Sequence, residues 1–156
     1  MPGARKKRDE LGIVALIEQH DHIIGTIRFV PMLHNLTLTE TLHAQFPVDA
    51  ALLTHGWEVG RLVMAPEFRS GPEFLKQCLS LALIFLCDNA QVENLHASCS
   101  HVLSRLYRRF GFSVLAKEIP LPGTEKTYTV IHGHISQVSN ALAPQSPIGQ
   151  PISYRA

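Results

Sequence analysis

The chain has 156 residues, of which 46% are hydrophobic and 17% are charged, and its formal net charge is +1. These values indicate one globular domain, because a chain of this length buries about 70% of the surface that it exposes when unfolded. The small net charge argues against a general nucleic-acid binder, which would carry a basic face.

The first predicted elements are two strands. Residues 11–30 contain two β-rich runs around a polar stretch at residues 18–22, which predicts a hairpin. Gly25 in the second run indicates a β-bulge or a close approach of backbones. Residues 35–56 have irregularly spaced leucines and predict a short helix with a loop, and Trp57 to Met64 predicts a further strand.

Two helices and a strand are expected next. Residues 70–73, Ser-Gly-Pro-Glu, match a capping box before the apolar helix at residues 74–87. Residues 94–99 then predict a strand. Ser100 is placed to cap a helix at residues 101–109, and Gly111 is placed to end that helix in a left-handed conformation.

A last hairpin is predicted from residues 112–119 and 126–135, followed by a polar, proline-bearing stretch. The expected fold class is therefore α/β, a mixed sheet covered by helices. We divide the chain into a basic N-terminal tail (residues 1–8), one folded domain (9–135) and a flexible C-terminal tail (136–156).

Cysteine and membrane signals are weak. Three cysteines without CxxC spacing predict neither a disulfide framework nor a zinc site. No signal-peptide apolar region follows the basic start, and no apolar run reaches the length of a membrane span. We therefore expect a cytoplasmic protein without a membrane span.

Three motifs resemble the GNAT acyltransferases. Leu106-Tyr107-x-x-x-Gly111-Phe112 is shared with GNAT enzymes generally. Gly25-Thr-Ile-Arg28 and Glu58-Val-Gly-Arg61-Leu-Val are similar to blocks of the branch with autoinducer (acyl-homoserine-lactone) synthases and N-acyl amino acid synthases, with Gly60 replacing a serine. The resemblance implies a mixed twisted sheet, flanked by helices and splayed where the acyl arm enters. Compared with the family pattern, we expect the N-terminal strand and helices of GNAT domains to be missing or shortened here.

The resemblance implies roles for a carboxylate and a phenol. Amine acylation needs a group that accepts the amine proton and one that protonates the leaving thiolate. Glu58 would be the base or the acceptor anchor, with Arg28 and Arg61 orienting it or binding the acceptor carboxylate. The alternative is a structural ion pair of Glu58 with either arginine. Tyr107 would be the general acid, or otherwise a tyrosine packed on the sheet.

The predicted donor site departs from the family pattern. Donor-binding residues are expected at the end of the strand and the start of the next helix: Val63, Met64, Arg69, Ser70, Gly71, Glu73 and Phe74. Pro72 and Phe74 replace two glycines of the pattern. Pro72 removes an N–H, and Glu73 places negative charge where a phosphate would bind. This favours acyl-phosphopantetheine on acyl-carrier protein, while acyl-CoA or acetyl-CoA stays open, as does a capped helix start without a ligand.

The histidines and one cysteine suggest weaker alternatives. His20-x-His22 and His132-x-His134 could each chelate a metal, but no companion ligand has suitable spacing, so we expect surface histidines and no metal. His101 could act as an auxiliary base. Cys99 is expected to be a buried cysteine rather than a nucleophile.

The sequence thus predicts an N-acyltransferase that moves an acyl group from a thioester to the amine of a small amino-acid-like acceptor. Residues 35–56 are expected to line a pocket for a longer acyl chain. Two alternatives stay open, namely an acetyl-CoA-dependent N-acetyltransferase and a GNAT-like binding module without catalysis. Acyl-carrier protein is a candidate partner, and a homodimer is compatible with this interpretation.

Overall fold

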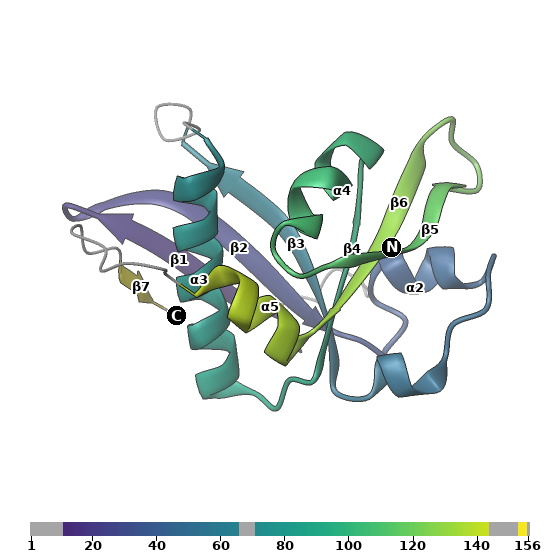
Figure 1. Cartoon of the computed structure of the whole chain (residues 1–156), viewed down its shortest axis with the longest axis horizontal. Coiled ribbons are helices and arrows are strands. Elements are labelled where there is room, and N and C mark those ends of the chain that lie inside the picture. Colours follow the sequence, from purple (N-terminus) through teal and green to yellow (C-terminus); the bar gives the residue numbers. More distant parts are fainter. Residues whose placement is uncertain (1–10, 66–70, 144–152, 156) are drawn as a thin grey trace.

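The computed structural model describes residues 11–65, 71–143 and 153–155. Within these residues, seven strands form one mixed sheet in the order β5-β6-β4-β3-β2-β1-β7 (Figure 1). The α/β fold class is thereby confirmed. In chain order the elements are β1 (Ile13–Gln19), β2 (His22–Pro31), α2 (Leu38–His43), the 3-10 helix η1 (Ala50–Leu53), β3 (Gly56–Met64), α3 (Pro72–Asn89), β4 (Asn94–Cys99), α4 (His101–Arg108), β5 (Ser113–Pro120), β6 (Thr127–His134), α5 (Ile135–Leu142) and β7 (Ser153–Arg155).

The first hairpin has the predicted turn and irregularity. His20 and Asp21 both have positive φ, 51° and 64°, as a two-residue turn between antiparallel strands requires. Ile17 pairs with Gly25 and Glu18 with Ile23, so one residue of β2 bulges out. A Cβ on Gly25 would lie 3.0 Å from the Val63 carbonyl oxygen. Gly25 therefore marks both a bulge and a close approach.

The centre of the sheet is split. β3 and β4 run parallel, but their paired residues extend only from Gly56 opposite Asn94 to Glu58 opposite His96. β3 continues along β2, with one extra residue between Gly60 and Val63, while β4 continues along β6. The two strands therefore diverge after Glu58, and α4 lies beside the opening (Figure 1). This is the splayed sheet that the resemblance implied.

The two long helices begin differently. α3 starts from Gly71, which has φ of +123° and makes no side-chain capping bond. The predicted capping box is wrong, because the N-cap is Gly71, which has no side chain to accept a hydrogen bond, and Pro72 directly after it fixes the helical φ. α4 starts as predicted, with the Leu103 N–H donating to Ser100 Oγ at 3.1 Å. Among the described residues, no helix is long and apolar enough to cross a membrane.

The C-terminal segment corrects one prediction. Residues 136–142 belong to α5, whose Val138 and Leu142 are 0% and 3% exposed and pack in the main core. β7 then pairs with β1 at the edge of the sheet. The prediction of a flexible tail is therefore wrong for these residues. The prolines and polar residues hid the apolar i, i+4 spacing and the capping box of His134 with Gln137.

The segment between β2 and β3 contains the short helix that was predicted. Thr37 caps α2 by accepting a hydrogen bond from the Glu40 N–H at 3.0 Å. Along β4, Leu95, Ala97 and Cys99 pack in the main core, so Ser98 belongs to the opposite face of the sheet. Ser98 there bonds to Thr39 of α2. α2 therefore covers the face that α3 and α4 leave open.

A candidate active site between two diverging strands

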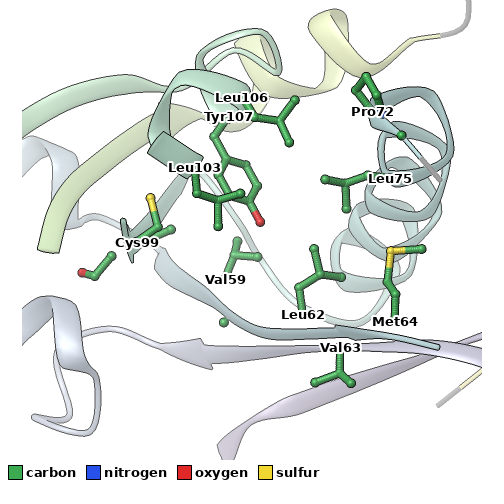
Figure 2. A pocket seen from close by; sticks show the side chains of 14 residues that line it. Val59, Leu62, Val63, Met64, Pro72, Leu75, Cys99, Leu103, Leu106 and Tyr107 are labelled. Carbon is green, nitrogen blue, oxygen red and sulfur yellow. The ribbon is translucent and has the colours of Figure 1, made fainter. Parts of the chain in front are cut away.

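A cavity of about 730 Å³ occupies the split between β3 and β4. Its walls come from both strands, the start of α3 and one side of α4 (Figure 2). Most of its side chains are apolar. It is lined by Val59, Gly60, Leu62, Val63, Met64, Gly71, Pro72, Leu75, Ala97, Ser98, Cys99, Leu103, Leu106 and Tyr107.

Consecutive residues of each strand contribute to this lining. Side chains on a strand alternate between its faces, so a cavity on one face would meet only every second residue. Here residues 62–64 and 97–99 all line the cavity. The cavity therefore lies along the open edges of the diverging strands, where ligands from the two faces of the sheet could meet.

Tyr107 lies on the α4 side of the cavity. It is 6% exposed, and its ring packs edge-on against Phe110 and Phe112, with centroids 6.1 and 5.7 Å away. The hydroxyl oxygen points into the cavity (Figure 2). Burial, with a smaller contribution from the nearby Cys99, raises the pKa of Tyr107 to about 12. The phenol is therefore protonated at neutral pH.

Glu58 lies where the pairing of β3 and β4 ends, on the opposite side of the sheet. Its Oε2 accepts a hydrogen bond of 2.8 Å from the Thr39 N–H, close to the start of α2. Burial raises the pKa of this carboxyl above its ordinary value, and hydrogen bonds from Thr39 oppose the rise. Glu58 is not among the lining residues. However, a Cβ on the lining residue Gly60 would be only 3.7 Å from Glu58 Oε1.

Of the two predicted arginines, the structure relates only Arg28 to Glu58. Arg28 pairs with Gly60 across β2 and β3, and its positive charge lowers the pKa of Glu58. Arg28 is thus close enough to influence Glu58, as both interpretations required. Arg61 belongs to β3, but its side chain lies outside what the structure describes.

Only some of the predicted donor-binding residues line the cavity. Val63, Met64 and Gly71 line the cavity. Phe74 packs against the core instead, and Glu73 is exposed in the first turn of α3. Arg69 and Ser70 lie outside the described residues.

Several lining residues were not predicted from the sequence. Leu103 and Leu106 are two of them, and their i, i+3, i+4 spacing with the predicted Tyr107 could have identified the side of α4 that faces the cavity. Ser98 could not be found in this way, because nothing in residues 94–99 indicates that β4 leaves its neighbour. No residue of 35–56 lines this cavity, whose described lining comes from later elements, so a role of that segment in an acyl pocket stays a prediction. That segment contacts the site through Thr39 instead.

The candidate histidines and Cys99 lie in turns, in hydrogen bonds within the fold or in the core. His20 is in the first turn, and His132 bonds through Nε2 to Asn94 Oδ1 at 2.8 Å. Within the described residues, no three His, Cys, Asp or Glu side chains form a group that could hold a metal ion. His101 Nδ1 is 3.3 Å from Thr129 Oγ1. Burial raises the pKa of Cys99 to about 11, which favours the unreactive thiol.

Several solved structures share this fold at low sequence identity. An uncharacterized protein from Bacillus halodurans has 10% identity and a TM-score of 0.58, over 78% of this chain and 58% of that one. BjaI, a CoA-dependent acyl-homoserine lactone synthase solved with SAM and isopentyl-CoA, has 21% identity and a TM-score of 0.59, over 86% and 64%. FeeM, an N-acyl amino acid synthase from uncultured soil microbes, has 12% identity and a TM-score of 0.65, over 86% and 74%.

These likenesses concern the fold, and the chain spans less than two thirds of the first two proteins. No curated protein sequence matches the chain. The family described as N-acyl amino acid synthase FeeM matches residues 5–134, which is most of the sequence. The resemblance to the branch of autoinducer and N-acyl amino acid synthases is thus confirmed, and the chain belongs to the FeeM family of N-acyl amino acid synthases.

Proposed function

We propose that the chain transfers an acyl group from a thioester to the amine of a small amino-acid-like acceptor. The observation that carries the proposal is the cavity in the split sheet, with the hydroxyl of Tyr107 on one side and the carboxyl of Glu58 close to the other. Membership of the FeeM family supports the same reaction. BjaI, which shares the fold, was solved with an acyl thioester, isopentyl-CoA.

The open edge of β3 suits the arm of an acyl donor. Phosphopantetheine is an extended chain with amide groups, and such a chain can hydrogen-bond to a strand edge as an added strand would. Beyond Glu58, β3 has no paired residue on β4, and this part of β3 lines the cavity. Leu62, Leu75 and Leu106 would then surround the acyl chain, which is apolar.

Tyr107 is proposed as the general acid. Burial keeps its phenol protonated, and its pKa of about 12 alone would make it a weak proton donor. A thiolate released in the same buried space is also disfavoured by lost hydration, so its own pKa rises as well. The proton transfer from Tyr107 to the departing sulfur is thus less unfavourable than a comparison of the raised tyrosine pKa with the ordinary pKa of a thiol suggests.

Glu58 is proposed as the base. A carboxylate is a weak base in water, but burial raises the pKa of Glu58 and brings it closer to that of the proton it must accept. Arg28 lies on the neighbouring strand and would bind the acceptor carboxylate or hold Glu58 in place. The acceptor would enter from the face covered by α2, opposite the donor.

The donor is proposed to be acyl-phosphopantetheine on acyl-carrier protein. Pro72 and Glu73, in the first turn of α3, reduce its capacity for the several phosphates of coenzyme A. Arg105 and Arg108 on α4 and Arg109 at its C-cap are exposed, and they would attract an acidic carrier protein, while another side of α4 lines the cavity. Acyl-CoA and acetyl-CoA are the alternative donors. A cytoplasmic location and a homodimer also remain part of this proposal.

A turnover assay with three donors tests the function. The protein is incubated with acetyl-CoA, long-chain acyl-CoA or long-chain acyl-carrier protein and a mixture of amino acids, and N-acyl products are measured by mass spectrometry. We expect products with the long-chain donors. Glu58→Gln and Tyr107→Phe should each slow the single-turnover chemical step by about 10²-fold or more.

The outcomes separate the alternatives. Products from acetyl-CoA alone would indicate an acetyltransferase. Binding of a thioester without product from any donor would instead favour a binding module. Wild-type rates in both variants would remove these two residues from the mechanism.

A further inference from the structure

Two hydroxyl groups lie between the cavity and the residues that hold Glu58. Ser98 lines the cavity, and its Oγ is 2.7 Å from Thr39 Oγ1. Thr39 is fully buried, and its N–H donates to Glu58 Oε2 at 2.8 Å. The carboxylate, Thr39 and Ser98 thus belong to β3, α2 and β4, which come together only in the folded chain.

The hydrogen-bonding capacity of these groups indicates which hydroxyl would donate and which would accept. A hydroxyl has one proton to donate and two lone pairs to accept with. The backbone N–H of Thr39 holds the carboxylate beside this residue, and the Thr39 side chain as well as its N–H lowers the pKa of Glu58. In the direction that a relay needs, the Thr39 hydroxyl donates its proton toward the carboxylate. It can then accept from Ser98 Oγ, which leaves the lone pairs of Ser98 free to accept from a group in the cavity.

We propose that Ser98 and Thr39 form a proton relay that carries the proton of the acceptor amine from the cavity to Glu58. The inference rests on the proposed acyl transfer and adds two residues to it. Ser98 contacts the amine, and Thr39 acts through Ser98. The relay explains how a carboxylate that is not among the lining residues serves a reaction inside the cavity.

The relay balances the proposed reaction. The amine nitrogen forms a bond to the thioester carbonyl carbon, and the bond from that carbon to sulfur breaks. One N–H proton passes to Ser98 Oγ, the Ser98 proton passes to Thr39 Oγ1, and the Thr39 proton passes to the Glu58 carboxylate. Tyr107 gives its proton to the thiolate. The proton on Glu58 leaves to solvent, and Tyr107 regains one from solvent, which restores the starting state.

Two further charges act on Glu58. Glu40 of α2 raises the pKa of Glu58, whereas Arg28 of β2 lowers it. The relay variants leave both residues unsubstituted. A change in the titration of Glu58 in a relay variant therefore reports the loss of the hydroxyl.

Isosteric variants test the relay. Thr39→Val removes the hydroxyl but keeps the backbone bond to Glu58, Ser98→Ala removes the cavity end, and Thr39→Ser restores a hydroxyl. We expect kcat with long-chain acyl-carrier protein to fall about 10²-fold in the first two and to recover in Thr39→Ser. Thr41→Val is the matched control, because Thr41 is exposed on the same helix, and it should keep the wild-type rate.

Two measurements distinguish a proton relay through Ser98 and Thr39 from a merely structural contact between them. The first is the pH dependence of kcat, whose acid limb should move in Thr39→Val. The second is the pKa of Glu58, measured by infrared difference spectroscopy without substrate, which should rise in Thr39→Val and stay the same in Thr41→Val. Thermal unfolding of each variant identifies any general loss of structure.

The relay and the function can fail separately. If the wild-type protein turns over a thioester but Thr39→Val and Ser98→Ala keep its kcat and pH profile, the relay is overturned and the function stands. If no thioester is turned over, the proposed function fails. In that case an unchanged Glu58 pKa in Thr39→Val would also overturn the hydrogen-bonded chain.

Discussion

Gly111 fixes the contact between the end of α4 and the C-terminal helix. Its φ is +92°, a conformation that side chains with a Cβ rarely adopt. A Cβ at this position would also lie 2.7 Å from the carbonyl oxygen of Gln137 in α5. The glycine therefore ends α4, as the sequence predicted, and also lets α5 pack closely, which the sequence did not indicate.

The two constraints on Gly111, its positive φ and its close contact with α5, can be separated by comparison with a second glycine. Gly123 has φ of +81° but nothing within 4 Å of its would-be Cβ. We expect Gly123→Ala to lower the free energy of unfolding by about 1 kcal/mol, through backbone strain alone. Gly111→Ala should cost about 2–4 kcal/mol, because overpacking against α5 adds to the strain. Urea denaturation measures both, and equal costs would contradict the close packing of α5.

At the scale of elements, a row of three histidines, with His96 buried and the other two half-buried, joins the segment from α2 to η1 with β4 and β6. The rings of His43 and His96 lie 5.6 Å apart, and those of His96 and His132 lie 5.0 Å apart. His96 Nε2 donates to the Leu52 carbonyl oxygen at 2.7 Å, because a carbonyl can only accept. Its Nδ1 is buried and has no hydrogen-bond partner among the described residues. A proton on Nδ1 would be a buried donor without an acceptor.

This packing predicts that the protein loses stability in mild acid. Burial lowers the pKa of His96 from its ordinary 6.5 to about 4. Between these values the unfolded chain binds the proton and the folded chain does not, so the free energy of unfolding falls as pH falls from about 6.5 toward 4. With about 1.4 kcal/mol for each pKa unit, the loss is roughly 3 kcal/mol. Burial also lowers the pKa values of His43 and His132, which adds to the effect.

Urea denaturation across pH 4–7 measures this loss. His96→Gln has no ring to titrate and should show a smaller dependence on pH. His22→Gln is the matched control, since His22 is exposed, and it should follow the wild type. A wild-type slope in His96→Gln would show that other groups cause the acid sensitivity.

At the scale of the whole molecule, the split between β3 and β4 leaves two parts of the sheet joined by a short paired stretch, Gly56 to Glu58 against Asn94 to His96. The cavity touches both parts, because its walls include β3, β4 and the helices α3 and α4. A ligand that fills it would bind the folded state only, and would therefore stabilise the whole domain.

At equal ligand concentrations, a long-chain acyl-CoA should give more of this stabilisation than coenzyme A alone, because its acyl chain should lower the Kd. At a ligand concentration of about 100 Kd the gain in unfolding free energy is about 2.7 kcal/mol, and thermal unfolding measures it. Leu103→Asp should remove most of the gain, since Leu103 lines the cavity and is 40% exposed. Val102→Asp should keep it, because Val102, which directly precedes Leu103 in α4, is 77% exposed and lies outside the lining. Equal losses in both variants would place the acyl chain elsewhere.

The sequence by itself determined the local elements and the family. The sequence contains local signals, which depend only on residues close together in the chain. They are the period-two and helical patterns, Ser100, Gly111 and the motifs around Glu58 and Tyr107. They were sufficient for the two hairpins, for the helices α3 and α4 and for membership of the acyltransferase branch.

Only the tertiary structure decided where β3 and β4 part and what surrounds the opening. The strand at residues 94–99 has the same alternation whether or not its neighbour stays paired, so Ser98 carries no sign of its place in the cavity. Thr39 is separated from Glu58 by 19 residues and from Ser98 by 59. Contacts over such separations depend on how the elements pack, and no pattern within one segment specifies them. The same holds for α5, whose role depends on the space that Gly111 leaves for it.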